Sequence, residues 1–216
     1  MSPPLNAPGQ PPAKLSRKER ARATRQRILH MARAEFLEQG YLATRMTAIA
    51  ERAGVSVQMV YLSFGSKPKL LGAILESAVF GDEGLPPPDT DWWARVTEAP
   101  TAAEMIRRLV IASGPVFKAA SPVWLVAQVG ATVDEDLAAS TVEGDRYRAR
   151  DYRRIVELAA TRGPLKAGLD LDTATDILVA MLSPAFYMEL VKGRDWGDER
   201  AIEWLADALP ALVCGE

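Results

Sequence analysis

Apolar side chains recur three and four residues apart along most of this 216-residue chain, which places them on one face of an α-helix. Strict alternation of apolar and polar residues, the pattern of a half-buried strand, is poorly represented. The sequence therefore predicts an all-α protein. Helices are expected at about residues 20–39, 46–53, 57–62, 66–80, 92–98, 134–161, 173–191 and 198–212, and from 102 to a kink or break at Gly114-Pro115. Asp172 is expected to cap the penultimate helix, and Pro184 to interrupt it.

Two of these helices are short and are separated by a tight turn. The apolar positions of 46–53 share one face, and Gly54 follows, where a glycine can take the left-handed conformation that ends a helix. Ser56 then stands where the next helix needs a cap for its free N–H groups. In that second helix, Val60 and Phe64 fall four apart and are expected to pack inward. The pattern indicates a helix-turn-helix, whose second helix enters the major groove of DNA.

Further residues in and around this motif stand at fixed spacings. They are Thr44, Ile49-Ala50, Ala53-Gly54-Val55-Ser56, Val60-Tyr61, Phe64, Ser66-Lys67 and Leu70, preceded by a helix from Thr24 to Gln39 that Gly40-Tyr41 closes. Together they resemble the DNA-binding half of the TetR family of bacterial transcriptional regulators, over about residues 21–81. Ser63 departs from the family, which more often has His or Tyr there, and one phosphate contact is thereby in doubt. The resemblance implies a three-helix DNA-binding head on a larger helical body that binds a ligand and dimerises.

Several side chains of the motif carry groups suited to DNA. Gln58 can donate and accept at once, which suits the edge of adenine, and Val57 can touch a thymine methyl group. Lys67 stands at a helix N-terminus, where its charge and the helix dipole both favour a phosphate. By resemblance, Thr44, Tyr61 and Lys67 occupy positions that commonly contact the DNA backbone. The expected DNA-binding residues are Thr44, Arg45, Thr47, Ser56, Val57, Gln58, Tyr61 and Lys67; the alternative for each is an ordinary polar or apolar residue on a surface helix.

The charge distribution supports a polyanionic partner for one end of the chain. The formal net charge is −2, yet the stretch 14–70 holds twelve Lys and Arg against four Asp and Glu. A basic third on an acidic body is typical of a protein that offers one end to DNA, although basic runs on solvated helix faces would look alike. One Cys and one His leave no metal cluster, disulfide framework or Cys–His nucleophile pair. No signal peptide or membrane-length apolar run is evident, so we expect a cytoplasmic bacterial protein without a membrane or cofactor.

Composition divides the chain into three parts. Residues 1–16 are rich in proline and are expected to be a disordered arm, or alternatively an arm whose basic residues touch the DNA backbone or minor groove. The DNA-binding domain is expected at 17–81. The stretch 81–90, with three consecutive prolines, reads as a linker, and the remainder, 82–216, as a helical ligand-binding and dimerisation domain.

The body contains aromatic and apolar material from which a ligand pocket is expected. A few polar side chains among such residues would orient a small molecule. Monomer core is the competing interpretation for each of these residues, because an aromatic at helical spacing is more often part of the core than of a pocket lining. The expected pocket residues are Trp93, Met105, Phe117, Trp124, Gln128, Tyr147, Arg150 and Phe186. Their apolar character favours a hydrophobic or aromatic effector.

A homodimer is expected because one helix-turn-helix contacts too little DNA for tight binding, and paired heads read two half-sites. The resemblance places the dimer surface on the last long helices. The expected residues are Ala180, Ala185, Ile202, Leu205 and Leu209, with monomer core as the competing interpretation for each.

Three functional hypotheses follow. The first is a homodimeric repressor that leaves a double-stranded DNA operator when a small hydrophobic molecule binds its body. The second is a ligand-independent DNA-binding protein whose helical body recruits another protein, which a solidly packed body would favour. The third, an enzyme, is disfavoured because the sequence has no nucleophile–base pair, no glycine-rich phosphate loop and no metal-ligand spacing.

Overall fold

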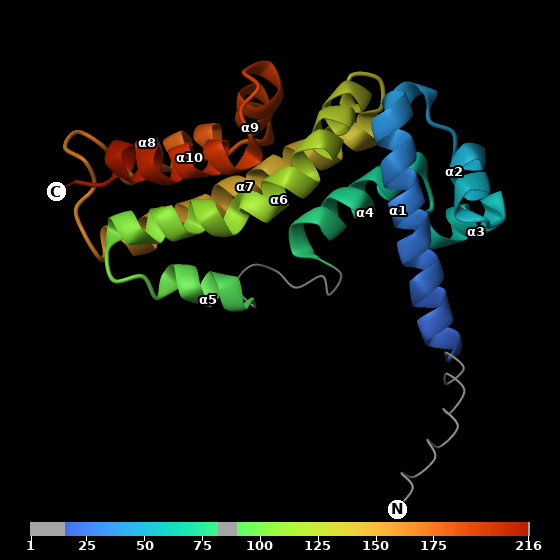
Figure 1. Ribbon diagram of the computed structural model, residues 1–216, viewed down its shortest axis with the longest axis horizontal. Helices are drawn as coiled ribbons and strands as arrows, with labels where there is room; N and C mark the ends of the chain where they lie inside the picture. Colours follow the sequence, from blue (N-terminus) through green and yellow to red (C-terminus); the bar gives the residue numbers. More distant parts are fainter. Residues whose placement is uncertain (1–15, 82–89, 216) are drawn as a thin grey trace, which may run out of the picture.

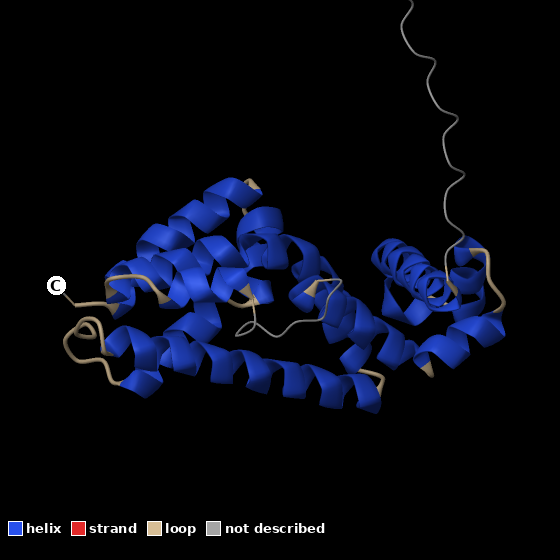
Figure 2. Cartoon of the chain, turned by 90° about the horizontal axis from the view of Figure 1, so that it is seen from below, coloured by secondary structure: helices blue, strands red, loops and turns tan. Residues whose placement is uncertain are grey.

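The computed structural model describes residues 16–81 and 90–215, and these form an elongated array of helices with a small head at one end and the C-terminus at the other (Figures 1 and 2). The expected arm, apart from Ser16, and nearly all of the expected linker lie outside the described residues. The helices are α1 (Arg17–Ala43), α2 (Met46–Ala53), α3 (Val57–Phe64), α4 (Lys67–Phe80), α5 (Asp91–Thr97), α6 (Ala102–Ala131), α7 (Glu135–Ala160), α8 (Leu171–Met181), α9 (Pro184–Met188), the π-helical turn η2 (Glu189–Gly193) and α10 (Asp198–Val213). The all-α prediction is confirmed.

The head begins with a capped helix. The Ser16 hydroxyl accepts from the Glu19 amide and the Glu19 carboxylate accepts from the Ser16 amide, so two free N–H groups are satisfied and α1 starts at Arg17, earlier than expected. Gly40 has a φ of 74°, which interrupts the regular helix at the expected residue. The short turn after Gly40 brings Tyr41 into the core of the head.

Of the expected kink or break at Gly114-Pro115, the break is wrong, because α6 runs unbroken from Ala102 to Ala131 with Pro115 and Pro122 inside it. A proline within a helix leaves the carbonyl four residues earlier without an N–H partner. For Pro115 this is the carbonyl of Ile111, and both residues are exposed, so water can reach this part of the helix surface. Gly114 lies on the packed side, where its absent side chain lets Ile202 of α10 approach: an added Cβ would meet Ile202 Cγ1 at 3.4 Å.

A second correction concerns the start of α8. Asp170, not Asp172, is the N-cap, and its carboxylate accepts from the Thr173 amide at 2.7 Å. Asp172 instead pairs with Arg153 of α7. The expected interruption at Pro184 is confirmed, since α8 ends at Met181 and α9 begins at Pro184, with Ser183 as its cap.

Buried apolar side chains form two clusters that share one helix. The body cluster takes Met105, Leu109 and Phe117 from α6, and the head cluster takes Val123 and Ala127 from the same helix. Polar contacts strengthen the junction of head and body, because the Tyr41 hydroxyl bonds to the Asp134 carboxylate at the start of α7 and Arg33 donates to the Ala119 carbonyl at 3.1 Å. Burial and the bond to Asp134 raise the pKa of Tyr41, so this hydroxyl stays protonated.

Helix α6 contains an apolar stretch long enough to span a membrane, which the sequence analysis did not expect. An 18-residue window within it has a mean hydropathy of 1.5, so by length and composition alone it could cross a membrane, contrary to the expectation that no such run exists. A third of that window is buried, and the helix supplies side chains to both hydrophobic clusters. Core helices of soluble proteins satisfy the same criterion.

Gly130→Ala tests the junction of head and body. A Cβ at Gly130 would lie 2.6 Å from Leu137 Cδ2 and 2.7 Å from Tyr41 Cγ, so both neighbours would have to move. We expect the free energy of unfolding, measured in urea, to fall by about 1–3 kcal/mol, the usual cost of overpacking. Gly144→Ala in α7 is the control, because nothing lies within 4 Å of its added Cβ and alanine should stabilise a helix by roughly 0.5–1 kcal/mol. Equal stability of Gly130→Ala and the unmodified protein would contradict this packing.

Candidate nucleic-acid interface and ligand cavity

Helices α2 and α3 form the expected helix-turn-helix at one end of the molecule (Figure 1). Gly54 ends α2 with a φ of 62°, and the Ser56 hydroxyl caps α3 by accepting from the Met59 amide at 3.2 Å. Val60 and Phe64 are the buried residues of α3, as expected. Helix α3 is two residues longer than expected, ending at Phe64 rather than near Leu62.

The outer face of α3 carries no charged residue. Val57, Gln58, Met59, Tyr61 and Leu62 are exposed, and Leu62 is 80% exposed. Of these, Gln58 and Tyr61 have hydrogen-bonding side chains. Met59 and Leu62 were missed in the sequence analysis, although both lie off the face that Val60 and Phe64 define, and that position alone would have identified them. The face combines one amide and one phenol with apolar groups that can contact thymine methyls.

Thr44 needs correction as a DNA contact. It is 2% exposed, and its hydroxyl donates to the Gly40 carbonyl at 2.7 Å, so its side chain closes the turn between α1 and α2. Gly40 causes this, because its positive φ turns the chain back on the end of α1. Arg45, Thr47 and Ser56 remain exposed beside α3, where they are free to approach a phosphate.

Two cations lie at the base of α3. Lys67, at the start of α4, is half-buried with its ammonium 4.3 Å from the centre of the Tyr41 ring, and burial lowers its pKa. Arg25 of α1 donates to the Ser63 carbonyl at 2.7 Å and lies 4.1 Å over the Phe64 ring. Arg25 therefore holds the C-terminal end of α3 against α1, a role that the sequence pattern did not indicate.

The body contains a cavity of about 570 Å³ between α4, α5, α6 and α7. Its walls include Leu75 and Val79 of α4, Trp92 of α5, Ser121 of α6 and Tyr152 of α7. Because α4 begins directly after the helix-turn-helix, a molecule in this cavity would touch a helix that is continuous with the DNA-binding head. The body is therefore hollow where a helical bundle could have been solidly packed.

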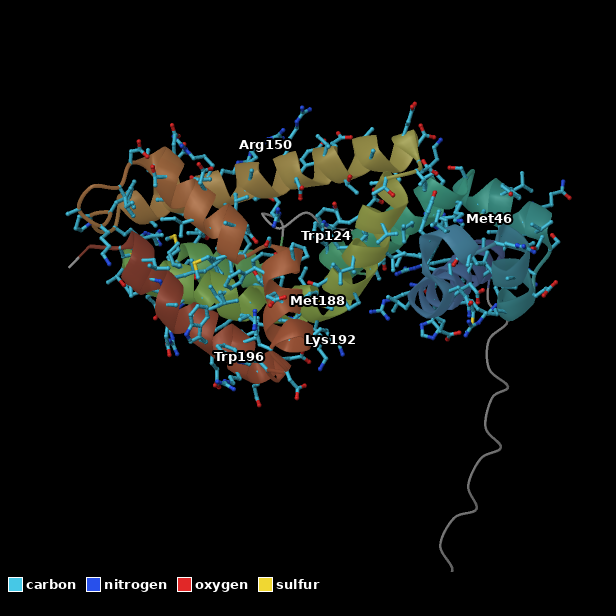
Figure 3. The ribbon with its side chains drawn as sticks, turned by 90° about the horizontal axis from the view of Figure 1, so that it is seen from above. Met46, Trp124, Arg150, Met188, Lys192 and Trp196 are labelled. Atoms are coloured by element: carbon cyan, nitrogen blue, oxygen red, sulfur yellow. The ribbon has the colours of Figure 1, made fainter. Side chains whose placement is uncertain are left out.

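Four of the eight expected pocket residues line this cavity, namely Trp93, Phe117, Trp124 and Tyr147. The other four do not, and their assignment is corrected. Met105 is fully buried in the body cluster, Gln128 lies away from the cavity, and Phe186 stacks on Trp204. Arg150 is exposed on α7, and its side chain points away from the other helices of the body (Figure 3). Trp124 lies on the opposite side of α7, among those helices (Figure 3).

The expected dimer residues separate into two groups. Leu205 and Leu209 have no exposed surface and belong to the body cluster, so the competing interpretation as monomer core is correct for them. Ile202 is half-buried against Gly114. Ala180 and Ala185 are exposed, and Trp204 and Leu212 of α10 are 41% and 40% exposed. An outward apolar surface on α8, α9 and α10 thus remains.

Among residues 16–81 and 90–215, no group of three or more His, Cys, Asp or Glu side chains could hold a metal ion. The candidate sites among the described residues are therefore the exposed face of the helix-turn-helix and the cavity of the body.

Comparisons with known proteins agree with this geometry. Residues 28–74 match the family described as bacterial regulatory proteins, tetR family. The chain is 28% identical over 203 residues to the HTH-type transcriptional regulator YdeS of Bacillus subtilis, covering 89% of this chain and 91% of that protein. Its fold is similar to NalD of Pseudomonas aeruginosa, with 20% identity, a TM-score of 0.67 and coverage of 92% and 99% of the two chains.

A further solved structure with this fold is the SmeT–triclosan complex, at 22% identity and a TM-score of 0.71, with 90% of this chain and 93% of that chain covered. The spacing of the helix-turn-helix residues, the match to residues 28–74 and the similarity to YdeS along nearly the whole chain lead to one assignment. Residues 28–74 are a DNA-binding domain of the TetR family, and the chain as a whole is similar to an HTH-type transcriptional regulator.

Proposed function

We propose that this protein is a homodimeric repressor of the bacterial cytoplasm that leaves its DNA operator when a small organic molecule fills the cavity of the body. The cavity of about 570 Å³ against α4 is the single observation that carries the proposal, because it connects an effector site to the helix that follows the DNA-binding motif. NalD, which has the same fold, is described as a repressor, and SmeT was solved with triclosan bound.

DNA binding would divide between two sets of residues. Gln58, Val57 and the exposed apolar side chains of α3 would read base edges, and Tyr61, Arg45, Thr47, Ser56 and Lys67 would contact phosphates. Two heads of a dimer would then meet half-sites roughly 34–36 Å apart, one turn of the double helix. The exposed surface of α8, α9 and α10 with Ala180, Ala185, Trp204 and Leu212 is the proposed dimer contact, and Ile202 lies at its edge.

The effector would act by shifting a population of conformations. It must bind the geometry that cannot hold DNA more tightly than the one that can, by about 1.4 kcal/mol for each tenfold loss of operator affinity. Helices α4, α6 and α7 all line the cavity, and α4 also packs against α1 in the head. A ligand that separates these helices would therefore change the spacing of the two heads.

The second hypothesis, a body that recruits another protein without a ligand, predicts solid packing. The cavity weighs against it, because the helices of the body leave space for a ligand between α4, α5, α6 and α7. The exposed apolar residues of α10 fit the dimer contact as well as they would fit a partner protein.

The primary test selects bound sequences from random double-stranded DNA at one fixed salt concentration, because affinity for DNA depends on salt. We expect a consensus with two-fold symmetry. Binding that is salt-sensitive but yields no consensus would leave the basic head as a non-specific anchor and would overturn the operator-specific function.

Tyr61→Ala should weaken binding to operator and non-specific DNA alike. Tyr61 is 49% exposed on α3, and a hydrogen bond from its hydroxyl to a charged phosphate would contribute about 1.5–3 kcal/mol. Gel-shift titrations measure both affinities. Val142→Ala in the body is the control, since Val142 is 51% exposed on α7 and does not line the cavity. Unchanged affinity for Tyr61→Ala would remove this residue from the interface.

Gln58→Ala should relax the preference at one base pair of the operator. Loss of its amide is expected to cost about 1–3 kcal/mol at the matching base and little elsewhere. Repeating the selection with this variant measures the change, and Gln39→Ala on α1 controls for loss of an exposed glutamine outside α3. An unaltered consensus would show that Gln58 does not read a base.

A further inference from the structure

The walls of the cavity combine aromatic rings with carboxylates. Three tryptophans, two phenylalanines and two tyrosines line it, and Trp92 and Trp93 meet edge to face with their ring centres 5.7 Å apart. The faces of such rings carry partial negative charge, so they attract organic cations as well as apolar groups. The rings alone would also accept a neutral apolar molecule. Whether the cavity prefers a neutral ligand or an organic cation therefore depends on the charged residues that line it.

Four carboxylates and one cation belong to the lining: Glu76, Glu143, Asp145, Asp151 and Arg148. The cation is already satisfied, because Arg148 donates to Asp145 at 3.1 Å and to the carbonyls of Val179 and Leu182 at the end of α8. After this pairing, the lining keeps the negative charges of Glu76, Glu143 and Asp151. An anionic ligand would therefore meet repulsion and find no uncommitted cation among the lining residues.

Asp151 is the least exposed of these four carboxylates, since Glu76, Glu143 and Asp145 are exposed. It is half-buried in the wall formed by α7, and its nearest cation, Arg154, is 3.8 Å away, beyond hydrogen-bond distance. Burial raises its pKa, and the weaker attraction of Arg154 and Arg150 only partly offsets this effect. A positive charge in the cavity would stabilise the ionised form, because opposite charges in a partly desolvated site attract more strongly than in water.

Ser121 places a buried polar atom behind the apolar wall of the cavity. Its hydroxyl is fully buried in the wall formed by α6, and it has no hydrogen-bond partner among the described residues. Buried hydroxyls are nearly always paired, so the Ser121 hydroxyl is an unsatisfied polar atom in this part of α6.

We propose that the cavity binds lipophilic organic cations, with the positive charge facing Asp151 and Glu143 of α7 and the apolar part among the tryptophan rings. This class of ligand covers aromatic onium ions and protonated aromatic amines. The proposal rests on the proposed function, in which the same cavity receives the effector.

A matched pair of ions tests the sign of the charge. Tetraphenylphosphonium and tetraphenylborate have the same size and shape and opposite charge, and calorimetric titration into the full-length protein measures their affinities. We expect the cation to bind at least tenfold more tightly than the anion. Equal or tighter binding of the anion, or no binding of either ion, would overturn the proposal.

Single substitutions then locate the charge. Asp151→Asn and Glu143→Gln should each weaken tetraphenylphosphonium binding on the order of tenfold, between the values for exposed and for desolvated ion pairs. Glu157→Gln removes a carboxylate from the same helix outside the cavity, where it pairs with Arg153, and should change nothing. Unchanged affinity in both cavity variants would show that these carboxylates do not attract the cation.

Gel shifts on the selected operator separate this proposal from the proposed function. Release of DNA by the cation supports both. If the cation binds but the operator complex survives, the ligand class stands and effector-driven release fails. If the anion releases the operator instead, effector-driven release stands and the ligand class fails.

Discussion

One continuous helix, α6, is the element on which the rest of the structure depends, because its two ends are buried in different cores. Its first half packs in the body and its second half, through Val123 and Ala127, packs in the head. A stiff rod shared by two cores prevents either from moving alone. The cavity lies beside α6, so the strain that a bound ligand produces can pass along this helix to the core of the head and to the core of the body.

In the DNA-binding head, the residues suited to general attraction to DNA differ from those suited to reading its sequence. The outer face of α3 carries no charge, and the cations stand around it on α1, at Arg45 and at the start of α4. Contacts to the DNA backbone supply a large share of the binding free energy and make it depend on salt, while base contacts supply selectivity. Substitutions on the outer face of α3 could thus change the preferred operator without changing the general attraction to DNA.

The sequence predicted the helices well because helical periodicity and caps are local signals. The boundaries of α2 and the caps Ser56 and Ser66 follow directly from neighbouring residues. Where prediction failed, the deciding partner lay elsewhere in the chain. Pro115 did not break α6, because its surroundings are open to water, and Asp172 did not cap α8, because Arg153 holds it.

The prediction of the dimer and cavity residues was limited in the same way, because it depended on neighbours that are distant in the chain. Periodicity identifies the apolar face of a helix but not the neighbour that covers it, so Leu205 and Leu209 could not be told from dimer residues until α6 was placed against α10. Likewise, Met105 and Trp124 both lie on α6, yet one is in the core and the other at the cavity. The acidic lining escaped prediction because its carboxylates come from α4 and α7, which are distant in sequence.

The tryptophans of this protein are confined to its body and are absent from the DNA-binding segment. Of its five, Trp92, Trp93 and Trp124 line the cavity and Trp196 and Trp204 lie against each other beside α10, whereas residues 1–81 contain none. Tryptophan fluorescence therefore originates entirely outside the segment that would touch DNA. A change in tryptophan emission when DNA is added would therefore report a conformational change that passes from the head to the body.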